Sequence, residues 1–288
     1  MKTFQNKVAV ITGGAGGIGL ALAEHAVQAG MKVVIADIRP EALATAAAQL
    51  RAAGGDVTTM VINVRRAEDI QALYQKAIDA YGKVNLLVNN AGVFASGLSW
   101  ATSNEEYRWV VDVNLMSVIY GITTFVPKMI ASGEECHVVN IASGAGLLTS
   151  PGFSTYSATK HAVVALSECL YLDLLTHQIP NVGVTLVMPG YVQSDVMNPD
   201  KVAPSAAVAQ ELGARLQDPV CGGVEMAMRQ GVAAGMPAAT AADLVFHAIE
   251  EKELYLSPNG AAHLDGARMI AQGRVEAQNF FPQMYAIA

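Results

Sequence analysis

The chain has 288 residues, of which 52% are hydrophobic and 15% charged, and its formal net charge is -7. This length suits one large α/β domain or two small ones, and so apolar a composition excludes a disordered chain. The acidic balance argues against a nucleic-acid or anionic-membrane partner, since either would select a basic patch.

Short runs rich in Val and Ile alternate with longer helical patterns along the chain. Strands are predicted at residues 8–12, 32–37, 57–63, 86–89, 137–142, 182–188 and 253–256. Helices are predicted at residues 20–29, 40–53, 67–81, 104–131 and 154–177, where apolar residues recur at helical spacing. This alternation predicts a single α/β domain over residues 1–288: a doubly wound, Rossmann-type parallel sheet of about seven strands with helices on both faces.

Two segments depart from the alternation. Residues 192–240 are rich in Ala, Gly, Pro and Met and predict a loop-and-helix excursion over the sheet. Its methionines fit a mobile substrate lid, because methionine adapts to irregular ligands, but they fit ordinary core gaps equally well. Residues 257–288 form a C-terminal tail of helix-like and aromatic character.

A glycine-rich loop, TGGAGGIG at residues 12–19, lies between the first strand and the first helix. Glycines let backbone N–H groups reach a pyrophosphate, and the following helix aims its positive end at the same phosphates. No Gly-Lys-Ser/Thr follows, which excludes a P-loop. An ordinary strand–helix turn is the alternative reading.

Asp37 ends the second strand, 18 residues beyond Gly19. A carboxylate at about this offset binds the adenosine ribose hydroxyls of a dinucleotide and repels a 2′-phosphate. NAD is therefore expected in preference to NADP, although the nearby Arg39 could soften that preference. The alternative is that Asp37 only caps the next turn.

Tyr156 and Lys160 lie four residues apart on a predicted helix, and so on one face about a turn apart. Such a lysine can lower a tyrosine pKa, and a shift of ~2–3 units needs about 3–4 kcal/mol. Ser143 follows the fifth strand, where strand ends form the ligand crevice, and its hydroxyl could hold a substrate oxygen. Taken alone, the spacing of Tyr156 and Lys160 is common on solvated helix faces, and Ser143 alone would be an ordinary turn serine.

These motifs together resemble the short-chain dehydrogenase/reductase family in its simple single-domain form. The resemblance covers about residues 5–195. It is carried by the glycine loop, Asn89-Asn90-Ala91-Gly92, Asn114, Ser143, Tyr156-Ser157-Ala158-Thr159-Lys160 and Pro189-Gly190.

The resemblance implies a role for each matching residue. The catalytic group would be Asn114, Ser143, Tyr156 and Lys160, with Asn114 anchoring a water that links Lys160 to solvent. The pyrophosphate would be held by Gly13, Gly17, Ile18 and Gly19, and the ribose by Asp37. The remaining cofactor contacts would be Asn63 and Val64 at the adenine, Asn90, Ala91 and Gly92 along the cofactor, Tyr156 and Lys160 at the nicotinamide ribose, and Pro189, Gly190, Val192 and Ser194 beside the nicotinamide.

The substrate pocket is expected after the fourth, fifth and sixth strands. Its candidate residues are Phe94, Ser143, Ala145, Phe153, Tyr191 and Met197. They are mainly apolar, and no arginine or lysine is expected to hold an acidic group. The expected substrate is a neutral, hydrophobic or aromatic secondary alcohol or the matching ketone. Dihydrodiol or sugar oxidation is the alternative within the family, and a non-catalytic NAD-binding regulatory protein is the rival outside it.

Other features set the surroundings. No uninterrupted apolar stretch approaches the roughly 20 residues of a membrane span, and a cytoplasmic protein is expected. Three cysteines without a CxxC pair fit a reducing compartment, with Cys136 and Cys169 expected to be buried. No histidine spacing indicates a metal site. A homodimer or homotetramer is expected, although the long tail puts the family's usual tetramer in doubt.

Overall fold

The computed structural model describes residues 1–260, 264–279 and 281. Seven strands form one sheet in the order β3-β2-β1-β4-β5-β6-β7, and every pair of neighbours is parallel. The strands are β1 (Val8–Thr12), β2 (Lys32–Asp37), β3 (Val57–Val61), β4 (Leu86–Asn89), β5 (Cys136–Ile141), β6 (Val182–Val187) and β7 (Tyr255–Leu256). The predicted doubly wound sheet is confirmed.

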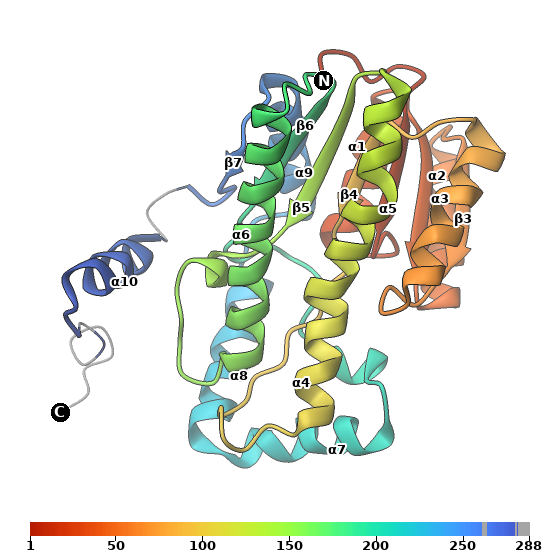
Figure 1. Cartoon of the computed structure of the whole chain (residues 1–288). Helices are drawn as coiled ribbons and strands as arrows, with labels where there is room; N and C mark the ends of the chain where they lie inside the picture. The colour runs from red at the N-terminus through yellow and green to blue at the C-terminus, as the bar shows by residue number, and fades with distance from the viewer. Residues whose placement is uncertain (261–263, 280, 282–288) are drawn as a thin grey trace.

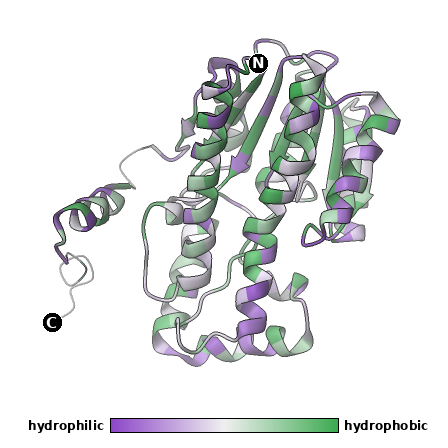
Figure 2. Ribbon diagram, viewed as in Figure 1, coloured by the Kyte–Doolittle hydropathy of each residue, from purple (hydrophilic) through white to green (hydrophobic). Residues whose placement is uncertain are grey.

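Helices cover both faces of the sheet (Figure 1). One face carries α1 (Gly17–Gln28), α2 (Pro40–Ala52) and α9 (Ala238–Glu251), which share a core cluster with Ile11 and Ile35. The other carries α3 (Ala67–Tyr81), α5 (Ser117–Ser132) and α6 (Ser154–Thr176), around Val10 and Val34. Successive strand residues point to opposite faces, so both faces need apolar side chains. Figure 2 shows this as hydrophobic strands between helices of mixed character.

The predicted helix at residues 104–131 is divided into three parts. α4 (Asn104–Val111) continues into a π-helical turn, η1 (Asp112–Met116), and then into α5. By length and composition, this helical stretch could cross a membrane, but 56% of its most apolar window is buried in the protein. Burial of that kind is what a core helix of a folded domain shows.

The lid, residues 192–240, lies beyond the carboxyl ends of the strands (Figure 1). It contains η3 (Pro199–Val202), α7 (Ala206–Ala214), η4 (Arg215–Gln217) and α8 (Pro219–Ala233), and it ends in the first residues of α9. A further 3-10 turn, η2 (Gly144–Gly146), follows β5, and α10 (Asp265–Glu276) forms most of the described tail. Residues 261–263, 280 and 282–288 of the predicted tail lie outside the described residues.

The cysteines are placed differently from the prediction in one respect. Cys136 is buried as predicted, and Cys221 in the lid is buried too, but Cys169 is exposed. The prediction for Cys169 was wrong because α6 is apolar around much of its circumference, so its sequence does not mark which side faces the sheet.

Candidate active site

A cavity of about 430 Å³ opens at the carboxyl ends of the central strands. Chain order reverses there, because β1 is followed by β2 on one side and lies beside β4 on the other. Ligands of open α/β sheets bind at such a switch point. The lining includes residues of the glycine loop, the ends of β2, β4 and β5, the start of α6, and the lid.

The glycine loop has the backbone shape that a pyrophosphate cradle requires. Gly13 and Gly17 have φ of 64° and 52°, a region that favours glycine, and both line the cavity with Ile18. Gly19 is needed for close packing, because a Cβ there would overlap the carbonyl oxygen of Gly13 and the side chain of Asn90. Gly19 therefore lets α1 pack against β1, and it is not among the described residues that line the cavity.

Asp37 is buried at the end of β2 and already has partners. Its Oδ2 accepts a hydrogen bond from the backbone N–H of Ala15 at 3.2 Å, which ties the carboxylate to the glycine loop. Its Oδ1 accepts from the backbone N–H and from Nε of Arg39, each at 3.1 Å. Arg39 also lies 3.7 Å from Asp195 of the lid, and the Asp37 hydrogen bond is the main cause that raises the pKa of Arg39.

Asn90 connects the two strands that flank the crevice. Its Nδ2 donates to the carbonyl oxygens of Thr12 and Gly13 at 2.9 and 3.1 Å. Its backbone N–H donates to Thr12 Oγ1, as does that of Ala91. These bonds fix the β1 and β4 ends relative to each other, so the predicted cofactor-binding residues on both sides stay in one arrangement.

The two ends of the predicted cofactor site both reach the cavity. Asn63 and Val64, which are expected at the adenine, line the cavity with Arg65, whose backbone N–H donates to Asn63 Oδ1 at 3.1 Å. The residues expected beside the nicotinamide also line it: Pro189, Gly190, Val192 and Ser194.

One supporting residue of the nicotinamide end was not predicted. Asn259 accepts from the backbone N–H of Gly190 at 2.8 Å and donates to Tyr191 O at 3.0 Å. Its position after β7 gave no local signal, because the contact depends on how the sheet brings its last strand beside β6.

Tyr156 and Ser143 face each other in the cavity. Ser143 follows β5 as the N-cap of η2, and Tyr156 lies in the first turn of α6. Burial raises the pKa of Tyr156, while a hydrogen bond with the Ser143 side chain acts in the opposite direction. Phe94 packs edge-on against the Tyr156 ring, with 5.1 Å between centroids. The phenol is therefore held in one place and is favoured in its protonated form in the protein alone.

Lys160 lies on the same face of α6. Its Nζ donates to Ile141 O at 2.9 Å and lies 5.6 Å from the centre of the Tyr156 ring. Burial lowers the pKa of Lys160 to about 8. The ammonium is therefore still mostly charged near neutral pH, yet it pays a large desolvation cost for that charge.

Asn114 reaches the same centre from the π-helical turn. It is fully buried, its Nδ2 donates to Val93 O at 2.9 Å, and its Oδ1 accepts from Val93 N at 2.8 Å. A Cβ at Gly92 would lie 3.4 Å from Asn114 Oδ1 and 3.6 Å from Lys160 Nζ, so Gly92 lies between the two. The structure thus brings all four predicted catalytic residues together.

The predicted substrate residues divide into two groups. Ser143 and Tyr191 line the cavity. The other four, Phe94, Ala145, Phe153 and Met197, are buried in a cluster behind Tyr156 and are not among the described residues of the lining. Sequence order placed them near the site correctly, but only packing decides which face of a loop is turned outward.

The lid supplies further lining residues, of which the sequence indicated only Met228, as one of the methionines of the lid. Val196, Val202, Met228 and Val232 give it an apolar wall, and Trp109 and Val113 face the cavity from α4 and η1. Lys201 also lines the cavity. Lys201 was not among the site residues predicted from the sequence.

Comparisons with known proteins agree with this geometry. The family model for short chain dehydrogenases matches residues 7–204. A "CLA biosynthesis dehydrogenase/reductase" of Lactiplantibacillus plantarum is 31% identical over 256 residues, which cover 89% of both chains. A "C alpha-dehydrogenase" of Sphingobium sp. SYK-6 is 36% identical over 71% of this chain and 67% of that protein. A short chain dehydrogenase/reductase of Burkholderia phymatum, solved in complex with NAD, is 37% identical, covers 97% of this chain and 98% of that one, and has a TM-score of 0.90.

Proposed function

Since this chain belongs to the short-chain dehydrogenase/reductase family, an oxidoreductase family, we propose that it transfers a hydride between NAD and a neutral, hydrophobic or aromatic secondary alcohol or ketone. The observation that carries this proposal is the meeting of Ser143, Tyr156, Lys160 and Asn114 at the end of a cavity that begins at Asp37. A protein that only bound a dinucleotide would have no need for this polar group.

In this proposal, Ser143, Tyr156 and Lys160 each have a separate role in the transfer of the proton. NAD, when bound, supplies the hydride acceptor. Ser143 holds the alcohol or carbonyl oxygen beside the Tyr156 hydroxyl, and Tyr156 exchanges the proton with that oxygen. Burial keeps the phenol protonated, which suits proton donation to a ketone oxygen. Alcohol oxidation needs the phenolate, and the Lys160 ammonium on the same helix face favours that form.

NAD is proposed over NADP because of the carboxylate at the end of β2. Asp37 is held towards the cavity by Ala15 N–H, and a carboxylate there repels a 2′-phosphate. Arg39 contacts the same carboxylate, and its positive charge works against strict selection of NAD over NADP. We expect kcat/KM with NAD to exceed that with NADP at least tenfold, and Asp37→Ala to reduce that ratio. Equal efficiencies for the wild-type enzyme would refute the proposed cofactor preference.

The apolar substrate is supported by the lid wall. Val196, Val202, Met228 and Val232 offer no hydrogen bonds to the hydroxyls of a sugar or dihydrodiol. Lys201 leaves an acidic alcohol as a specific second candidate. A panel of cyclohexanol, 1-phenylethanol, a dihydrodiol, a sugar alcohol and a hydroxy acid separates these classes.

The decisive variant is Tyr156→Phe. It removes the proton-transferring hydroxyl and keeps the ring that Phe94 contacts. We expect turnover of the best panel substrate to fall at least a thousandfold while NADH binding, followed by its fluorescence, changes less than threefold. Retention of wild-type turnover by this variant would sink the proposal. Absence of any NAD-dependent reaction in the wild-type protein would favour the regulatory alternative.

A further inference from the structure

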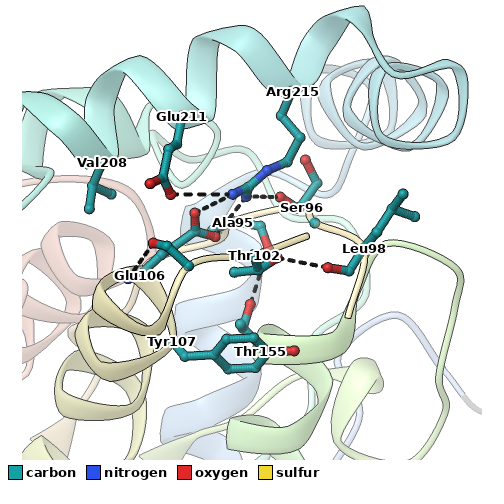
Figure 3. A network of polar contacts seen from close by, with 12 residues as sticks. Ala95, Ser96, Leu98, Thr102, Glu106, Tyr107, Thr155, Val208, Glu211 and Arg215 are labelled. Atoms are coloured by element: carbon teal, nitrogen blue, oxygen red, sulfur yellow. Dashed lines mark hydrogen bonds and ion pairs between the residues drawn. The ribbon is translucent and has the colours of Figure 1, made fainter. Parts of the chain in front are cut away.

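A buried ion pair joins the lid to the body of the molecule, outside the acid–base group described above (Figure 3). Glu106, in the first turn of α4, has a fully buried side chain, and that of Arg215, at the start of η4, is 9% exposed. Arg215 Nη1 donates to Glu106 Oε1 at 2.7 Å, and its Nη2 donates to Oε2. A two-armed contact of this kind fixes direction as well as distance.

The same guanidinium also holds the loop that follows β4. Its Nη1 donates to the carbonyl oxygen of Ser96. The next residue, Gly97, has no room for a side chain, because a Cβ would lie 2.9 Å from Arg215 Nη1 and would overlap Thr102 Oγ1. Figure 3 shows Arg215 reaching down from the lid between Ser96 and Glu106. One lid residue therefore binds two separate segments of the body.

A second polar contact ties α8 to the same loop. The Ser96 hydroxyl donates to Glu225 Oε2 at 3.3 Å, and Glu225 is itself buried. On the other side, Val208 of α7 is fully buried in a cluster with Trp109. Both lid helices are thus attached at positions that leave little freedom to move separately from α4.

In the structure, the Glu106 carboxylate does not take the capping role that its position in the sequence indicates. Ser103 and Glu106 have the spacing of a capping box, in which the glutamate would return to the N-cap N–H. Ser103 Oγ accepts from Glu106 N at 3.3 Å, as that motif requires. The carboxylate, however, binds Arg215 instead.

One of the two attached helices, α8, forms part of the cavity wall. Met228 and Val232 of α8 line it, and Phe94, two residues before Ser96, packs against Tyr156. We propose that the Arg215–Glu106 pair is a positioning device that holds α7 and α8 on the body of the molecule, so that the apolar wall formed by α8 stays at a set distance from Tyr156. This inference rests on the proposed function, because the wall bounds the site where Tyr156 would act.

The test compares Arg215→Met with a control, Arg108→Met. Arg108 lies on α4, two residues after Glu106, but its side chain is exposed. We expect Arg215→Met to raise KM for cyclohexanol, or for the best alcohol of the panel, at least tenfold. Its kcat should stay within twofold of wild type and its NADH affinity within threefold. Amide hydrogen exchange should accelerate at least tenfold in residues 206–233. The control should change neither the KM nor the exchange rate.

A double variant guards against misfolding caused by an unpaired buried charge. Glu106→Leu with Arg215→Met removes both charges and should show the same KM rise and the same faster exchange. Arg215→Lys keeps the charge but loses the two-armed contact with Glu106. Its KM and its exchange rate should lie between those of wild type and Arg215→Met.

The outcomes separate this inference from the proposed function. An unchanged KM, an unchanged exchange rate, or a parallel fall of kcat and NADH affinity in the double variant would overturn the positioning role. If the wild-type protein turns over no alcohol, the proposed function fails instead. The exchange rates of the variants then decide whether the pair holds the lid.

Discussion

Lys160 is the proposed partner of Tyr156 in proton transfer, and burial of its charge lowers the stability of the folded protein. Its ammonium is buried at the head of the cavity with one backbone acceptor, Ile141 O, at 2.9 Å. Burial lowers its pKa from 10.5 to about 8. Between these two values the unfolded chain binds more protons than the folded one, so the free energy of unfolding rises with pH over that window. Below pH 8 the folded state carries the full cost of the buried charge.

Lys160→Met should therefore stabilise the protein and abolish its activity. The shift from 10.5 to about 8 corresponds to about 3 kcal/mol, and loss of the hydrogen bond to Ile141 O offsets about 1 kcal/mol. We expect a gain of about 2 kcal/mol in the free energy of unfolding at pH 7, measured by urea denaturation. The gain should shrink by pH 9.5, where the wild-type lysine is mostly neutral. A variant less stable than wild type at pH 7 would contradict this view of the site.

At the scale of elements, a chain of buried amides holds the central strands under the site. Asn89 on β4 donates to Asn140 on β5 at 2.8 Å, and Asn140 donates to Ser167 on α6 at 2.9 Å. This chain fixes the registration of α6, which carries Tyr156 and Lys160, against the two strands beside the crevice. Close packing adds to it, since a Cβ at Gly121 of α5 would overlap the Asn89 side chain.

Asn140→Ala should break this chain at its middle. It leaves the Asn89 amide without its acceptor and creates a small cavity, so we expect a loss of about 2–3 kcal/mol in the free energy of unfolding. Thr123→Ala is the control, because that exposed hydroxyl bonds only to carbonyls of its own helix and its loss should cost under about 0.5 kcal/mol. Equal effects of the two substitutions, in parallel thermal and urea unfolding, would show that the amide chain contributes little.

At the scale of the whole molecule, the outer side of α6 carries apolar residues that nothing in the described chain covers. Leu172 and Leu175 are 53% and 60% exposed, and Tyr171 lies beside them. Family members are typically oligomeric, and an exposed apolar stripe on a long helix suits a subunit contact.

Leu172→Glu with Leu175→Glu should convert a homodimer or homotetramer to smaller species in light scattering coupled to size exclusion. Two charges in an apolar contact are costly, while the exposed face of a monomer accepts them readily. Val275→Glu is the comparison, because Val275 is 87% exposed on α10. If that variant dissociates instead, the contact lies at the C-terminal tail.

Much of this fold and site could be predicted because the signals are local. Apolar runs separated by helical periods imply a parallel sheet, and glycines before a helix imply a phosphate cradle, whatever the rest of the chain does. Tyr156 and Lys160 share a face because helical geometry places residues four apart together. The π-helical turn was missed, since no residue from Asp112 to Met116 marks it in the sequence.

The sequence by itself thus determined the sheet, the glycine loop and the pairing of Tyr156 with Lys160, because each depends on spacing along one element or on where a strand ends. The tertiary structure alone decided what surrounds that pair. It buried Phe94 and Phe153 in the core and placed Asn259 in contact with Gly190. It also paired Arg215 of the lid with Glu106, which lies 109 residues earlier in the chain. The physical reason is that a contact between distant segments depends on packing and burial in the folded state, and neither is encoded in local periodicity.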